Sequence, residues 1–196
     1  MVSFSFVAVV GLAAHISALS PPLPGYGIAP VTWEVETSPG GPKVNLTGTV
    51  QEVVAQLMEL DPNYGAHFNN ATASVVEQQE KNKRMTSLNK RDTRCGGLGN
   101  AQKTAIQKGI IHLRTVNGRP SNGPGPNNCG RVSCSDNSAI WWCNDNDNTK
   151  VLGSFNNLAD SAQVILNACF KSGALLGGGQ EDHTDKWRGI VKEDSC

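Results

Sequence analysis

The stretch RVSCSDNSAIWWC, residues 131–143, decides the fold that we expect for this chain. Asp136 and Asn137 form a turn signal between two strand-like segments, a pattern typical of a β-hairpin. A two-residue turn at this point places Cys134 opposite Ala139. We therefore expect these residues to form two neighbouring strands of a small antiparallel sheet.

The pleat of this hairpin separates its two tryptophans, because successive strand residues point to opposite faces of a sheet. The expected register puts Val132 opposite Trp141, and Cys143 on the same face. We expect this cysteine-bearing face to pack against helices. Ile140 and Trp142 then lie on the other face, which we interpret as a binding face. Its candidate occupants are a partner protein or the helical segment Val50–Leu60, further upstream in the chain. The alternative is that a neighbouring Pro/Gly-rich loop buries Trp142.

The sequence around the hairpin alternates between strand and helix patterns. Asn100 is expected to cap the first helix and Ser154 the second. The expected elements are a strand at 92–97, a helix at 101–116, a loop at 117–128, the hairpin, a helix from Ser154 to Gly173, and a strand at 187–196. The order β-α-β-β-α-β predicts an α+β fold, a small disulfide-stapled two-layer α/β sandwich.

All six cysteines lie in the last 102 residues: Cys95, Cys129, Cys134, Cys143, Cys169 and Cys196. An even number in a short segment predicts three disulfides. A zinc site is the competing interpretation, but the chain has no CxxC pair. Six cysteines allow fifteen pairings. We expect the terminal cysteine to hold the last strand, without assigning its partner.

The segment upstream of the cysteines predicts a small ββα unit. Residues 31–36 alternate between apolar and polar side chains, and 43–50 form a second candidate strand. Thr49 and Glu52 have capping-box spacing at the start of a helical pattern that runs to Leu60. From residue 69 the chain becomes polar and charged, and we expect residues 69–91 to be a solvated linker.

A basic pair, Lys90-Arg91, separates this segment from the cysteine-rich part. We interpret residues 1–18 as a signal peptide, 19–91 as a pro-segment that is released by cleavage after the pair, and 92–196 as the mature domain. The alternative is that the ββα unit stays attached as a second domain. Asn45 and Asn70 lie in glycosylation sequons. We expect a secreted, extracellular glycoprotein, and no pattern decides whether it enters host cells.

Composition and motifs argue against several other classes of function. The formal net charge is zero, without the basic stripe of a nucleic-acid-binding protein, and no stretch after residue 18 is apolar enough to span a membrane. His112 and His183 would have to meet in one cleft for a ribonuclease-like mechanism. The sequence NDNDN at 144–148 lacks the glycine and glutamate of a calcium loop. We expect no catalytic residue, metal or cofactor.

The motif CGRVSCSDNSAIWWCNDN, followed by a helix around Cys169, GGGQ and a closing SC, resembles small secreted cysteine-rich proteins of filamentous fungi. It is most similar to the secreted-in-xylem-type effectors, and its layout resembles the α/β sandwiches of smut killer toxins. The resemblance covers roughly residues 95–196. It implies virulence-associated binding to a host or partner protein rather than catalysis. The alternatives are a killer-toxin-like protein or a small secreted nuclease-type hydrolase.

Overall fold

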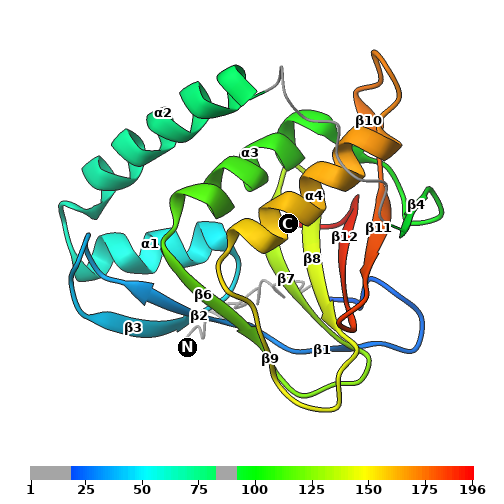
Figure 1. Cartoon of the computed structure of the whole chain (residues 1–196), viewed down its shortest axis with the longest axis horizontal. Helices are drawn as coiled ribbons and strands as arrows, with labels where there is room; N and C mark the ends of the chain where they lie inside the picture. Colours follow the sequence, from blue (N-terminus) through cyan, green and yellow to red (C-terminus); the bar gives the residue numbers. More distant parts are fainter. Residues whose placement is uncertain (1–18, 83–91) are drawn as a thin grey trace, which may run out of the picture.

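The computed structural model describes residues 19–82 and 92–196 (Figure 1). The expected signal peptide, 1–18, and the basic pair Lys90-Arg91 lie outside the described residues, so their interpretation remains a prediction. Four helices and three sheets make up the described part, which has a mixed α+β fold as expected.

The larger sheet has six strands in the order β1-β7-β8-β12-β11-β4. These strands are β1 (Gly27–Ile28), β7 (Asn128–Ser135), β8 (Ser138–Asn144), β12 (Trp187–Glu193), β11 (Gly179–His183) and β4 (Asp92–Cys95). All neighbours are antiparallel except β1, which runs parallel to β7. The sheet therefore contains a strand, β1, from the segment upstream of the basic pair.

The predicted hairpin is confirmed as β7 and β8. Asp136 and Asn137 both have positive φ, 48° and 53°, as a tight two-residue hairpin turn requires. Cys134 pairs with Ala139, as the turn predicts. Beyond this point the expected register is wrong, because a bulge between Arg131 and Ser133 leaves Val132 unpaired.

The assignment of the two hairpin faces is also wrong. Ile140 and Trp142 are 2% and 0% exposed and belong to the core cluster that includes the helices. Trp141 is equally buried on the opposite face, in a cluster against which Leu23 and Tyr26 of the upstream segment pack. Alternation along a strand separates two faces but does not say which one a helix covers. The proposed binding face at Ile140 and Trp142 is therefore core.

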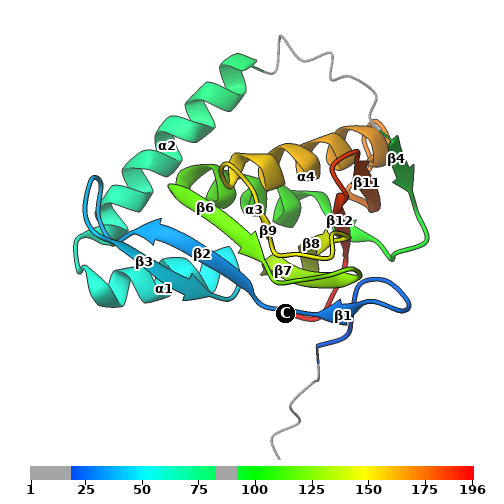
Figure 2. The same cartoon turned by 60° about the horizontal axis from the view of Figure 1, so that its bottom comes forward.

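Helices α3 (Lys103–Thr115) and α4 (Asn156–Cys169) cover one side of the six-stranded sheet, in which β1 is an edge strand (Figure 2). Both helices were predicted, but the predicted caps are wrong. Neither has a side-chain cap bond, and the cap positions are Gln102 and Phe155 rather than Asn100 and Ser154. The second helix ends at Cys169, before Gly173. The six-element order is also too simple, because it omits β11 and several short strands.

The second sheet joins the two parts of the chain. Its order is β3-β2-β6-β9, with bounds Lys43–Thr47, Val31–Glu36, Gly118–Asn122 and Lys150–Val151. The expected loop at 117–128 thus contains a strand, β6, which pairs with β2. A short ladder of β5 (Ala101–Gln102) and β10 (Leu176–Gly177) forms the third sheet. The predicted ββα unit exists, but it shares a sheet with the downstream part.

The two upstream helices pack on the same core. Helix α1 (Val50–Leu60) begins at the predicted capping box, which Thr49 and Glu52 form. Helix α2 (Tyr64–Asn82) replaces most of the expected linker. Its inner residues include Phe68 and Thr72, which contact α3. Because only a narrow face of α2 packs inward, most of its residues are polar. The composition of the segment therefore suggested a solvated chain.

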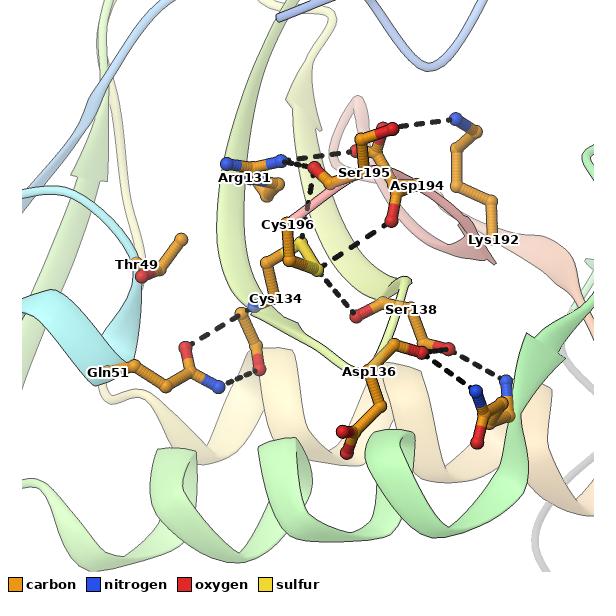
Figure 3. Close-up of a disulfide and its surroundings, with 12 residues drawn as sticks. Thr49, Gln51, Arg131, Cys134, Asp136, Ser138, Lys192, Asp194, Ser195 and Cys196 are labelled. Carbon is orange, nitrogen blue, oxygen red and sulfur yellow. Dashed lines mark hydrogen bonds and ion pairs between the residues drawn. A yellow bond between two sulfur atoms is a disulfide. The ribbon is translucent and has the colours of Figure 1, made fainter. Parts of the chain in front are cut away.

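The three predicted disulfides are confirmed, and no described cysteine is free. Cys95 bonds to Cys169, Cys129 to Cys143, and Cys134 to Cys196. The first joins β4 to the end of α4, and the second joins β7 to β8. The third ties the carboxyl terminus to β7, as Figure 3 shows.

Candidate functional site

A polar cavity of about 340 Å³ opens where β9 and the loop after it meet α4 and the ends of β11 and β12. Its lining includes Lys150, Asn157, Asp160, His183, Asp185 and Trp187. Of these residues, only His183 was a candidate from the sequence. The others come from separate elements that only the folded chain brings together.

His183 is the last residue of β11 and stacks on Trp187, its cross-strand neighbour. The two ring centroids are 3.5 Å apart and the planes differ by 13°. His183 Nε2 lies 3.1 Å from Glu181 Oε2 and 3.5 Å from Ser161 Oγ. Residues that are two positions apart on a strand point to the same face, so Glu181 and His183 both point from β11 toward α4. Residues Gly179–His183 therefore form a strand that packs on a helix, not a surface loop.

The contacts of Ser161, His183 and Glu181 differ from those of a catalytic triad. In a triad the acid and the nucleophile use different nitrogens of the imidazole ring, whereas here both contact Nε2. Ser161 and Glu181 are 1% and 0% exposed. An added Cβ on Gly189 would lie 2.1 Å from Ser161 Oγ, so the strand backbone closes over the hydroxyl. The cluster joins α4 to β11 and β12.

Charged pairs form the rim of the cavity. Lys150 Nζ lies 2.7 Å from Asp185 Oδ2, and Arg114 Nη2 lies 2.6 Å from Asp160 Oδ1. Burial is the largest single influence and would raise the pKa of Asp185, but the hydrogen bond from Lys150 opposes it. The backbone N–H of Asp185 and the charges of Lys150 and His183 act in the same direction, and the pKa lies below its usual value. Both rim carboxylates are therefore neutralised within the chain.

His112 lies elsewhere in the fold. Its ring is 5.4 Å from that of Phe68 on α2, and α3 lies between α2 and α4 in Figure 1. Burial lowers the pKa of His112, and the charge of Lys108 lowers it further. His112 Nδ1 is buried and has no hydrogen-bond partner among the described residues. The structure therefore does not bring His112 to the cavity that His183 lines.

The NDNDN segment is held by contacts within the protein. Asp145 accepts hydrogen bonds from the Tyr26 hydroxyl at 2.9 Å and from Arg188 at 2.8 Å. Asn144 is fully buried and donates to backbone carbonyls, including that of Asn148 at 2.9 Å. Among residues 19–82 and 92–196, no group of three or more His, Cys, Asp or Glu side chains is placed to hold a metal ion.

The two sequon asparagines lie at the surface. Asn45 is exposed on β3, at the edge of the four-stranded sheet, and Asn70 is exposed on α2. Their glycosylation remains a prediction. None of the helices in the described part of the chain is long and apolar enough to cross a bilayer.

Comparison of the chain with known proteins finds no matching family model, no similar curated protein and no similar solved structure.

Proposed function

We propose that this chain is a secreted, effector-like protein that acts by binding a host or partner protein. In this proposal its role is virulence-associated and non-enzymatic. The three disulfides support secretion, because disulfides persist in oxidising compartments such as the extracellular space. The resemblance of residues 95–196 to secreted-in-xylem-type effectors supports the binding role.

The burial of Ser161 is the observation that carries the non-enzymatic part of the proposal. Its hydroxyl contacts His183 Nε2 but is 1% exposed behind the backbone of Gly189. A histidine–serine pair acts on a substrate only where the hydroxyl can reach the reacting group. The cavity is therefore better suited to accept a polar side chain of a partner than to use this serine as a nucleophile.

A nuclease-type hydrolase remains the second candidate, and one observation favours it. A fully buried carboxylate, Glu181, lies 3.1 Å from a histidine at a cavity. Such pairs also occur in active sites that use general acid–base chemistry. A killer-toxin-like activity is the other alternative, and it rests on the resemblance in layout alone.

Hydrolysis assays distinguish binding from catalysis. The oxidised protein is incubated with single-stranded RNA, duplex RNA and duplex DNA, beside His183→Gln and Lys150→Ala variants. The proposal predicts no turnover by any of the three proteins. Turnover by the wild type that is lost in His183→Gln but kept in Lys150→Ala, with both variants folded by circular dichroism, would overturn it.

We also propose that Lys90-Arg91 is the site at which a secretory convertase cuts the chain, after removal of residues 1–18. The support is the position of the pair between a segment without cysteine and a segment with six. Sequencing the amino termini of the secreted protein tests this. The expected termini are Leu19 and Asp92, and a Lys90→Ala/Arg91→Ala variant should lack the second one.

A further inference from the structure

The segment upstream of the basic pair supplies an inner strand of the four-stranded sheet. Strand β2 lies between β3 and β6, and it pairs with β6 over residues 31–35. Without the upstream segment, β6 would keep only β9, with which it shares two paired positions. A two-stranded ribbon of this size is at best marginally stable in water.

Trp33 on β2 fills the core that α4 and β6 enclose. Its ring stacks on Phe155, with centroids 4.4 Å apart and an interplanar angle of 21°. It is 0% exposed, and its Nε1–H donates to the carbonyl of Gly48 at 2.8 Å. Removal of the upstream segment would expose Phe155 and much of the face of α3 that the upstream residues cover.

Two glycines of the downstream part leave room for the upstream backbone. An added Cβ on Gly118 would lie 2.1 Å from the carbonyl oxygen of Glu34. An added Cβ on Gly130 would lie 2.4 Å from Val31 Cγ2 and 2.7 Å from the carbonyl oxygen of Ala29. Real Cβ atoms do not approach other atoms so closely. The downstream strands are therefore shaped to contact β2 and the residues before it.

Side-chain hydrogen bonds also cross between the two parts. Gln51 on α1 donates through Nε2 to Ser133 Oγ at 2.9 Å, and its Oε1 accepts from the Cys134 N–H at 3.3 Å (Figure 3). The Thr72 and Thr115 hydroxyls are 3.3 Å apart, between α2 and α3. No disulfide joins the parts, because all six cysteines lie at or after position 95.

We propose that residues 19–82 form a permanent, non-covalent subunit of the folded protein rather than a removable pro-segment. A cut between the two described parts then yields a two-chain protein. The upstream segment of the same chain is the partner that covers the surface formed by α3, α4, β6 and β7. This inference goes beyond the proposed binding function and holds whether or not the protein is an enzyme.

Cutting the chain changes the thermodynamics of unfolding in a recognisable way. An intact linker gives the two parts a high effective concentration, on the order of millimolar for a short flexible chain. After the cut, unfolding also separates two molecules, so the melting temperature depends on protein concentration. The uncut protein should show no such dependence.

The test uses the full chain with residues 83–91 replaced by a Gly/Ser linker that contains the recognition site of a sequence-specific endoprotease. Cutting is followed to completion on a denaturing gel. We expect both fragments to elute as one species from a size-exclusion column, and to separate in denaturant without reducing agent. We also expect the melting temperature of the cut protein to rise between about 1 and about 100 µM.

Two glutamines on α1 provide a matched pair of variants. Gln51 bonds to the downstream part, whereas Gln56 donates only to the carbonyls of Thr47 and Glu52 on its own side. In the cut protein, Gln51→Ala should weaken association roughly tenfold, and Gln56→Ala less than about threefold. Elution of residues 92–196 without the upstream fragment at micromolar concentration would overturn the proposal. Equal effects of the two variants would contradict the interface described here.

Discussion

Trp142 lies at the contact between β8 and the helical layer. Its ring meets that of Trp187 edge-on, with centroids 6.4 Å apart. The carbonyl of Trp142 accepts from Asn122 Nδ2 at 2.8 Å, which links β8 to β6. Its Nε1 is buried and has no hydrogen-bond partner among the described residues. The indole therefore contributes packing, while its N–H carries a desolvation cost.

Trp142→Ala should lower the free energy of unfolding by about 3–5 kcal/mol, because it leaves a large cavity in the core. Trp142→Phe keeps a ring and removes the unpartnered donor, so it should cost much less. Urea unfolding measures both changes. The control is Val76→Ala on α2, where the valine is 40% exposed. Its free energy of unfolding should lie within about 0.5 kcal/mol of the wild-type value. A Trp142→Ala variant as stable as this control would contradict the assignment to the core.

His112 should make the protein less stable in mild acid. Burial, followed by the charge of Lys108, lowers its pKa in the folded state. Below its usual pKa of about 6.5 the unfolded chain therefore binds more protons than the folded one, and stability falls as the pH falls. His112→Gln should flatten the stability profile between about pH 6.5 and 5, measured by urea unfolding. His67→Gln, at an exposed position on α2, should leave the profile unchanged.

At the scale of the element, Gly109 sets how closely α3 approaches the sheet. An added Cβ at this position would lie 2.6 Å from Ser133 Oγ and 3.0 Å from Ile140 Cδ1. The helix gives up some intrinsic stability at this glycine, because Gly is a poorer helix former than Ala. Because glycine has no side chain, α3 can pack directly on β7 and β8.

Gly109→Ala should lower the free energy of unfolding by about 1–3 kcal/mol, because the added methyl group overpacks the contact. The gain in helix propensity, about 1 kcal/mol or less, does not offset this. Gly153→Ala is the matched control, since an added Cβ there meets only Asn157 Oδ1 at 3.9 Å. Thermal melting compares the two. A Gly109→Ala variant that is as stable as Gly153→Ala would show that the contact can relax.

At the scale of the whole molecule, the disulfides act on only one of the two parts that share the core. Cys95–Cys169 spans 74 positions of sequence, Cys134–Cys196 spans 62, and Cys129–Cys143 spans 14. A crosslink stabilises mainly by restricting the unfolded chain, and more so for a longer loop. Residues 19–82 gain nothing directly from this restriction and are held by packing and hydrogen bonds.

Replacing Cys95 and Cys169 by Ala should cost roughly 4 kcal/mol, and replacing Cys129 and Cys143 roughly 3 kcal/mol, on the loop-entropy estimate. Chemical unfolding of the two double variants measures the difference. Alkylation of the denatured, non-reduced wild type should label no thiol. Labelling of two or more cysteines in secreted protein would contradict the three disulfides.

Features that depend on near neighbours in the chain could be predicted from the amino-acid sequence. The turn at Asp136-Asn137 has the residues that a tight hairpin needs. The capping box of α1 involves residues only three positions apart, Thr49 and Glu52. The number of disulfides follows from an even cysteine count. Each of these signals lies within a few residues or in the composition, so it could be recognised without the fold.

Contacts between faces and between distant segments could not be predicted in this way. A strand pattern cannot tell which side a helix will cover, so Trp141 and Trp142 were assigned to the wrong faces. Strand β11 carries Glu181 and His183 and lacks an apolar alternation, so no sequence pattern placed these two residues on a strand beside α4. The pairing of β2 with β6 joins residues on opposite sides of the basic pair. Such contacts depend on packing between elements that are far apart in the chain. The local conformational preferences of the residues carry no information about that packing.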